Sequence, residues 1–483
     1  MRSSLLALAV ALAALAAACG SGDGPAPPPD AGDAGDGGSG GGPPTGGDQP
    51  SQPSGGDQPS GGGQPGGGAT GGGLPPGGGA GNGGAPPGGG GSGGGGAPPG
   101  SGGGAEAFPV RSADGTVTID RSDASGECDG LLPRSAPDAI SVPAVGAPLA
   151  CGWGVSEGHG HVAVQMDQRQ SLATWQAFSP GGTVERTFGV AFNGSSVVAP
   201  RPLIFPQFDG WVAATMAIWG GGPVVQVEVV GLLPDGTARG DPTRVTPDDG
   251  QILSWMLVED PRGGAAFVRT GNPPAGPGCV IAVARFDAHG VPRGPPATFA
   301  GHASTCVAVA AVSREGEALV VEKAEASAWL HWIRADGTEA VAPAAAGGFA
   351  GLFSSGQPVA LAPLLDGSVV ASEGGVWTRR FAHLGDRAEA APGWLASRPG
   401  YTFRNTRGER GYALFPPGGE TASCTQKIEL LAPSGRLCGT VTLSDPGGAC
   451  RTRTVDQGWD GTVVQQGPRE RCAWRWWPGL LGG

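Results

Sequence analysis

The stretch Val224-Val-Gln-Val-Glu-Val-Val-Gly-Leu-Leu-Pro-Asp-Gly-Thr237 carries the two signals that decide the fold. It begins with a run rich in β-branched residues, which favours a strand. It ends with Asp235-Gly236, a dipeptide that favours a tight reversal of the chain. The stretch therefore predicts a strand that ends in a hairpin turn.

The same arrangement recurs about every fifty residues. Its turns are Gly181-Gly182, Asp235-Gly236, His289-Gly290, Asp336-Gly337, Gly385-Asp386 and Ser434-Gly435, with successive glycines 54, 54, 47, 48 and 50 residues apart. A second set of turns comes earlier in each unit, at Gly158, Asp209-Gly210, Gly263-Gly264, Glu315-Gly316, Asp366-Gly367, Arg410-Gly411 and Asp460-Gly461. No long stretch has the period of a helix. The seven turns of the second set indicate seven repeat units.

A period of 45 to 55 residues with several short strands is typical of the blades of a β-propeller. We therefore predict an all-β propeller of six to eight blades, with seven as the leading count, over residues 106–483. The last unit is short, and the segment Phe108–Ile119 is expected to supply the missing strand. Tandem β-sandwiches are the alternative. By their period alone, without a WD, kelch or NHL signature, the repeats resemble the degenerate repeats of bacterial β-propeller lipoproteins.

The N-terminus has the pattern of an export signal over residues 1–18. Arg2 precedes an apolar run from Leu5 to Ala18, which is too short to span a bilayer as a helix. Leu15-Ala-Ala-Ala-Cys19 resembles the lipobox of bacterial lipoproteins, although Ala16 stands where that box usually has Leu. The resemblance implies that Cys19 is lipidated and becomes the mature N-terminus. The alternative is cleavage at the same bond by signal peptidase I, which would release a soluble protein.

Residues 19–105 are almost entirely Gly, Pro, Ala, Ser, Asp and Gln. Such a segment cannot bury enough apolar surface to offset the entropy of ordering, so we predict a disordered tether. Its span as a Gly-rich coil is roughly 50 Å. Its many G-x-G-x-x-G matches lack a preceding strand and a following helix, so they predict no dinucleotide site, and we expect no cofactor.

The charge balance excludes one class of partner. The chain has 42 acidic and 30 basic residues and a net charge of −12. No basic patch stands out, so we expect no nucleic acid partner. The expected partners are a membrane, through the lipid on Cys19, and an unidentified protein or glycan.

Eight cysteines follow Cys19, and an even number in an exported chain predicts disulfides. Spacing alone leaves 105 pairings open. The cysteines nevertheless fall in sequential couples, which favours the pairs Cys128–Cys151, Cys279–Cys306, Cys424–Cys438 and Cys450–Cys472. A zinc site is the competing interpretation, but the sequence has no C-x-x-C pair.

Two groups of side chains are candidates for ligand binding. His159 and His161 would face one side of a strand and share a metal, but no third ligand is evident, and a turn rich in Gly and His is the alternative. Trp474, Trp476 and Trp477 cluster with Arg475 and would bind sugars if exposed. The alternative is a closing strand that buries them.

The leading functional hypothesis is a non-enzymatic lipoprotein at the outer membrane or cell surface, whose propeller binds a protein or glycan. A domain that faces the periplasm is the alternative placement. The alternative is a hydrolase or lyase that acts on polysaccharide in the propeller channel. A third is a structural module without a specific ligand. Convergent carboxylates, Arg or His at one mouth of the channel would favour the enzyme, and an exposed aromatic patch would favour binding.

Overall fold

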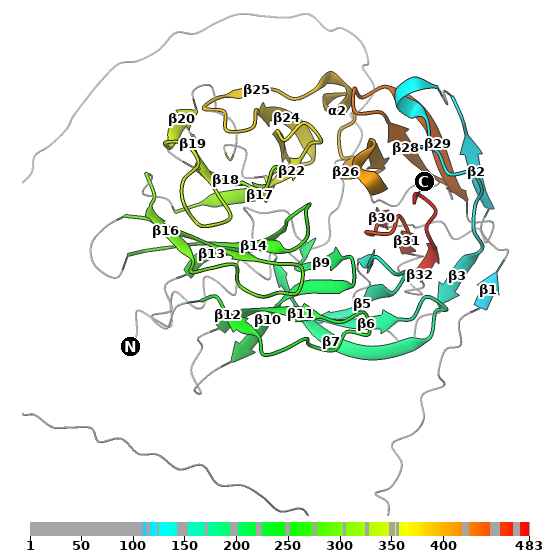
Figure 1. Ribbon diagram of the computed structural model, residues 1–483, viewed down its shortest axis with the longest axis horizontal. Coiled ribbons are helices and arrows are strands. Elements are labelled where there is room, and N and C mark those ends of the chain that lie inside the picture. The colour runs from blue at the N-terminus through cyan, green and yellow to red at the C-terminus, as the bar shows by residue number, and fades with distance from the viewer. Residues whose placement is uncertain are drawn as a thin grey trace, which may run out of the picture. The chain divides into compact units, whose positions relative to one another are not determined.

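Seven small antiparallel sheets lie in a ring in the computed structural model of the chain (Figure 1). The structure describes residues 110–482 except 113–115, 123–124, 143–152, 170–171, 194–200, 219–224, 247–251, 274–277, 303–305, 324–327, 347–352, 354–356, 418–424, 445–454 and 467–473. The predictions for residues 1–18, for Cys19 and for the tether therefore lie outside the described residues. The predicted all-β propeller with seven blades is confirmed, and tandem β-sandwiches are not found.

The strands follow the repeat along the chain. Blade 1 contains β4 (Gly154–Ser156), β5 (Val162–Arg169), β6 (Leu172–Phe178), β7 (Val184–Asn193) and β8 (Arg201–Pro202). Blade 2 contains β9 (Ile204–Gln207), β10 (Gly210–Ile218), β11 (Val225–Leu232) and β12 (Thr243–Arg244). Blade 3 contains β13 (Ile252–Glu259), β14 (Ala265–Gly271), β15 (Val280–Phe286) and β16 (Ala297–Ala300).

Blades 4 and 5 have the same plan of four antiparallel strands. Blade 4 contains β17 (Ala308–Val312), β18 (Ala318–Lys323), β19 (Ala328–Ile333) and β20 (Ala344–Ala346). Blade 5 contains β22 (Val359–Pro363), β23 (Val369–Glu373), β24 (Val376–Phe381) and β25 (Ala388–Ala390). Among the described residues, the helices are α2 (Gly393–Ala396), η1 (Gly126–Cys128) and η2 (Arg407–Glu409). Within the described part of the chain, no helix has the length and hydropathy needed to cross a bilayer.

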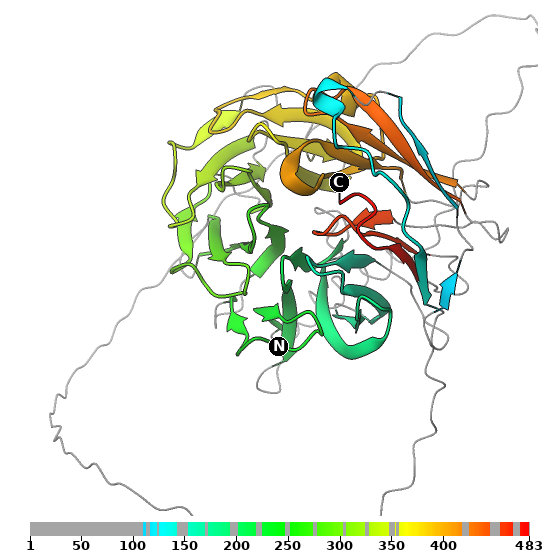
Figure 2. The same ribbon diagram turned by 45° about the vertical axis from the view of Figure 1, so that its right-hand side comes forward.

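Strands from both ends of the chain build the last two blades. Blade 6 contains β26 (Thr402–Asn405), β27 (Tyr412–Phe415), β28 (Thr425–Leu431), β29 (Leu437–Ser444) and, outermost, β2 (Thr116–Asp120). Blade 7 contains β30 (Val455–Gln457), β31 (Val463–Gln466), β32 (Trp474–Trp477), β3 (Ala139–Val142) and, outermost, β1 (Val110–Ser112). Figure 2 shows the cyan N-terminal strands beside the orange and red C-terminal ones.

The N-terminal segment closes the ring differently from the prediction. The fourth strand of blade 7 is β3, which pairs Ile140 with Trp476, and not the segment Phe108–Ile119. That segment divides instead: β1 pairs with β3, and β2 pairs with β29 of blade 6. Pairing between strands more than 300 residues apart leaves no local sequence signal, so the prediction named the wrong strand.

The two sets of predicted turns occupy equivalent places in the blades. The first set joins the third and fourth strands of a blade, and the second set joins the first and second. Because neighbouring strands are antiparallel, both sets lie at the same face of the ring. We call this the turn face. At Asp235-Gly236, the amide of Gly236 donates to the carbonyl of Leu233, and Gly236 takes a φ of +81°, which favours glycine.

The first strand of each blade lies innermost. β13 contacts β17, β17 contacts β22, and β4 contacts both β9 and β30, so these strands surround the axis. The apolar core lies between successive blades. Trp332 of blade 4 is fully buried and donates to the carbonyl of Gly385, in the turn between β24 and β25 of blade 5. Trp476 of blade 7 packs on Phe178 of blade 1 with ring centroids 5.6 Å apart. No blade can bury both its faces alone, so each depends on its neighbours.

Candidate functional site

The innermost strands bring opposite charges together at the axis. Arg404 of β26 donates from Nε to Asp456 of β30 at 3.1 Å and also contacts Glu259 of β13. The charge of Asp456, and after it that of Glu259, raises the pKa of Arg404 against the opposing effect of burial. One arginine thus links three blades across the axis.

A second ion pair joins the turns of blades 4 and 6 on the turn face. Arg314, in the turn before β18, donates from Nε to Glu409 of η2 at 2.7 Å. The side-chain hydrogen bond from Arg314 to Glu409 raises the pKa of Arg314. Charged side chains therefore do converge near one mouth of the channel, but cation and carboxylate are paired with each other. These ion pairs link different blades. They do not provide the separate general acid and general base that hydrolysis would use.

The structure places the rings of His159 and His161, the predicted metal ligands, against different partners. Both lie at the turn between β4 and β5. The ring of His161 is 3.0 Å from Glu157 through Nδ1 and 3.7 Å from Glu185 through Nε2. The ring of His159 instead packs edge-on against Phe208, with centroids 4.7 Å apart. Among the described residues, no group of three ligating side chains contains these two histidines.

Phe208 and His159 form an exposed aromatic pair on the turn face. Phe208 is 55% exposed, and His159 is exposed beside it. The pair joins the first turn of blade 1 to the first turn of blade 2. Exposed aromatic rings are suited to contact with sugars or with protein side chains.

The predicted tryptophan surface is not exposed. Trp474, Trp476 and Trp477 are 1%, 0% and 1% exposed, because β32 is the third strand of blade 7 and is covered by β3 and by the neighbouring blades. They cannot present a sugar-binding platform, so the alternative of a closing strand that buries them is correct.

The disulfides agree only partly with the predicted couples. Cys279–Cys306 is confirmed. Cys128 bonds to Cys438, 310 residues away, which overturns the couples Cys128–Cys151 and Cys424–Cys438. Cys151, Cys424, Cys450 and Cys472 lie outside the described residues. The correction has a topological cause, because β2 and η1 place Cys128 against β29 of blade 6.

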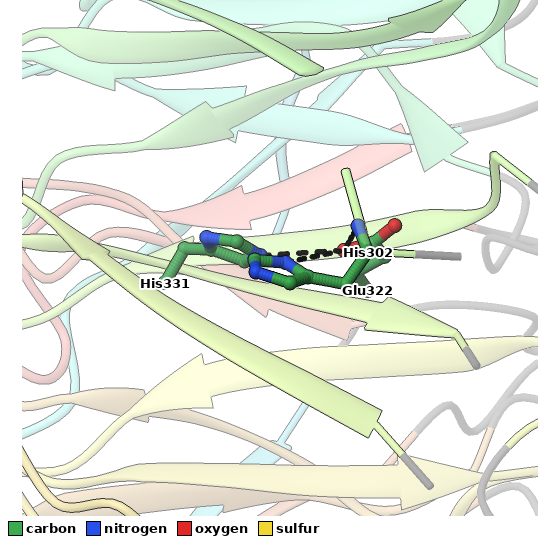
Figure 3. Close-up of side chains that lie close together, drawn as sticks. All are labelled: His302, Glu322 and His331. Atoms are coloured by element: carbon green, nitrogen blue, oxygen red, sulfur yellow. Dashed lines mark hydrogen bonds and ion pairs between the residues drawn. The ribbon is translucent and has the colours of Figure 1, made fainter. Parts of the chain in front are cut away.

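The structure brings together a different group of side chains, His302, Glu322 and His331 (Figure 3). Glu322 belongs to β18 and His331 to β19, while His302 follows β16 of the preceding blade. Oε2 of Glu322 lies 3.3 Å from Nε2 of His331 and 3.7 Å from Nδ1 of His302. All three ligating atoms lie within 4.8 Å of one another.

Strand pairing explains how two of these residues meet. In the antiparallel pair β18–β19, Val320 is opposite His331, and Glu322 is opposite Trp329. Residues that are opposite or two positions apart share one face of a sheet, so Glu322 and His331 are diagonal neighbours. That face is turned toward blade 3, because His331 stacks on Phe299 of β16 with ring centroids 4.6 Å apart.

The disulfide Cys279–Cys306 holds the third member in place. His302 lies between the end of β16 and Cys306, and its amide donates to Oε2 of Glu322 at 2.9 Å. Its ring stacks on Trp329 with centroids 3.8 Å apart and an interplanar angle of 10°. The amide of Gly301 donates to the carbonyl of Cys279 at 2.8 Å. The segment around His302 is therefore tied to β15.

Sequence reasoning did not find this group. None of His302, Glu322 and His331 is among the ligands predicted above from the sequence. The available signal was an acid in an otherwise apolar strand, Ala318-Leu-Val-Val-Glu322, because a buried carboxylate needs a partner. Which partner it finds depends on the contact between blades 3 and 4.

The ring of seven sheets defines the class: the chain contains a seven-bladed β-propeller. No protein-family model and no curated protein sequence matches it. Solved structures similar to it include the Dos1 propeller, with 8% identity over 67% of this chain and 76% of that one and a TM-score of 0.33.

Two further similar structures are enzymes by name. Polysaccharide lyase Uly1 has 8% identity over 77% of this chain and 99% of its own, with a TM-score of 0.37. Prolyl oligopeptidase B from Galerina marginata has 8% identity over 67% of this chain and 48% of its own, also with a TM-score of 0.37. Propeller folds carry many unrelated functions, so these likenesses assign none to this chain.

Proposed function

We propose that the chain is an exported lipoprotein, anchored through Cys19, that displays the propeller at the outer membrane or cell surface as a binding or scaffold domain. The observation that carries the proposal is the pair of disulfides Cys128–Cys438 and Cys279–Cys306. Disulfides persist in oxidising compartments outside the cytoplasm and are rare within it. They agree with the predicted export signal at residues 1–18.

The lipid anchor is supported by the sequence that surrounds Cys19. The lipobox-like residues end at this cysteine, and the Gly-rich segment up to residue 105 would separate an anchor from the propeller. The exposed pair Phe208–His159 on the turn face is the surface that we expect to meet a protein or glycan ligand.

Expression of the full chain in a bacterium that processes lipoproteins tests the anchor. We expect wild-type protein to incorporate labelled palmitate and to stay in the membrane fraction after a high-salt wash. Cys19→Ser should remove the label and release the chain from that fraction. An intact mass that corresponds to an unmodified Cys19 at the N-terminus would refute lipidation and favour cleavage by signal peptidase I.

The alternative function is an enzyme that acts on polysaccharide, and it would have to use the carboxylates at the axis. Depolymerisation of a polysaccharide by the purified chain, lost in Glu259→Gln, would replace the binding proposal.

A further inference from the structure

We infer that His302, Glu322 and His331 form a binding site for a divalent transition metal ion, with zinc as the best match. The inference does not rest on the proposed function, because it concerns a different face of the blades from the exposed aromatic pair. It starts from a carboxylate that is completely buried. Glu322 has a side-chain exposure of 0%, and so does His331.

The separations of the ligating atoms fit one ion. Two ligands held about 2.0–2.2 Å from a tetrahedral ion are roughly 3.3–3.6 Å apart. Oε2 of Glu322 is 3.3 Å from Nε2 of His331 and 3.7 Å from Nδ1 of His302. The first separation lies within this range and the second just above it, and all three ligating atoms lie within 4.8 Å of one another. The side chain of His302 is partly exposed, so its ring has room to move toward the other two ligands. Small rotations of this ring therefore suffice.

The types of ligand select the metal. Two imidazole nitrogens and one carboxylate oxygen suit zinc and related transition metals, whereas calcium and magnesium prefer oxygen ligands throughout. Three protein ligands leave a position for solvent. The side chain of His302 is 34% exposed, so water reaches the group from its side.

A second carboxylate orients one of the ligands. Nδ1 of His331 lies 3.5 Å from Oε1 of Glu339, on the side of the ring away from Glu322. Histidine ligands in metal sites usually donate their other ring N–H to a carboxylate or carbonyl, which fixes the tautomer that leaves the ligating nitrogen unprotonated. Glu339 can have this role for His331.

The alternative is a set of hydrogen bonds without a metal. Glu322 accepts the amide of His302 at 2.9 Å and faces the ring of His331, and these contacts would satisfy a buried carboxylate. These hydrogen bonds alone do not explain why the ring of His302 also lies near Oε2 of Glu322. They also do not explain why the ring of His331 has a carboxylate on each side, Glu322 and Glu339. The two interpretations differ in whether a metal ion binds with defined stoichiometry.

Isothermal titration with zinc chloride tests the inference on the full, disulfide-bonded chain, purified without a polyhistidine tag and stripped with a chelator. We expect wild type to bind one zinc ion per chain at a saturable site and to unfold at a higher temperature with zinc. His302→Ala should weaken binding at least about tenfold, and Glu339→Gln roughly 10- to 100-fold. His302 is the useful position because, unlike His331, its exposed ring can be removed without opening the core.

His383→Ala is the matched control. His383 also contacts a carboxylate, Glu317 at 2.8 Å, and an indole, Trp332, and its exposure of 29% is close to that of His302. It should bind zinc as wild type does. Cobalt substituted at the site should give visible absorption bands in wild type and His383→Ala, but not in His302→Ala.

Two results would overturn the metal site. One is the absence of saturable zinc binding to wild type, which would leave the hydrogen-bonded cluster as the explanation. The other is an equal loss of affinity in His302→Ala and His383→Ala, which would mean that zinc binds elsewhere.

Discussion

The carboxylate of Asp366, in the turn between β22 and β23, has identifiable hydrogen-bond and ion-pair partners that set its pKa. It accepts the amide of Ser368 at 3.0 Å and pairs with Arg380 at 2.8 Å. Burial acts to raise its pKa, but the hydrogen bonds from Ser368 and the contact with Arg380 overcome this and lower the pKa below the usual 3.8.

Asp366→Asn tests this at the scale of a single residue. Because the pKa is lower in the folded state, the carboxylate stabilises the fold at neutral pH, and this contribution is lost as the pH falls from 3.8 through the folded-state pKa. The side chain is half exposed, so we expect a loss of at most about 1 kcal/mol at neutral pH. Urea unfolding between about pH 6 and about pH 2.5 should show the two proteins converging in acid.

Ser368→Ala removes one of the donors to Asp366 and should show the same dependence on pH with a smaller amplitude. Parallel stability curves for wild type and Asp366→Asn over the whole range would contradict the assigned pKa.

At the scale of the element, the turn Asp235-Gly236 shows why glycine recurs at this place in the blades. Gly236 has a φ of +81°, and a Cβ placed there would lie 2.6 Å from Cδ1 of Phe188 in blade 1. Phe188 in turn stacks on Trp211 of blade 2 with ring centroids 6.4 Å apart. The turn of one blade is thus packed against the side chains of the previous one.

We expect Gly236→Ala to lower the free energy of unfolding by about 1–3 kcal/mol, from backbone strain and from the displacement of Phe188. Gly240→Ala is the control, because a Cβ at Gly240 would meet nothing within 4 Å. Urea unfolding followed by tryptophan fluorescence would measure both variants. Equal stabilities of the two variants would show that the turn geometry is not under strain.

At the scale of the whole molecule, closure of the ring joins the two ends of the domain. β3 completes blade 7, β2 extends blade 6, and Cys128–Cys438 holds the N-terminal segment to β29. The bridge spans 310 residues, whereas Cys279–Cys306 spans 27 within one region of the ring. A crosslink that closes the larger loop removes more entropy from the unfolded chain.

The double variant Cys128→Ser with Cys438→Ser should therefore be less stable than the double variant Cys279→Ser with Cys306→Ser. On the loop-entropy relation, the losses in unfolding free energy are about 6 kcal/mol and about 3.5 kcal/mol. Chemical denaturation of both variants beside wild type would measure them. A smaller loss for the long-range bridge would mean that the N-terminal strands stay in place without it.

The repeat and its turns could be predicted from the sequence because they depend on local chemistry. A few residues are enough to predict the Asp-Gly turn at Gly236 and a β-branched strand such as β11. The spacing of these turns and strands along the chain predicts the number of blades. The prediction of seven sheets therefore needed no knowledge of which strands meet.

Only the tertiary structure decided how distant parts of the chain combine. Cys128 bonds to Cys438, and β3 rather than Phe108–Ile119 fills blade 7, because both choices depend on contacts made when the ring closes. The meeting of His302 with Glu322 has the same cause, since it requires blade 3 to pack on blade 4. Turns and strands can be predicted from short stretches of sequence and their spacing. These pairings instead arise from the packing of one blade on another, and no short stretch of sequence specifies that packing.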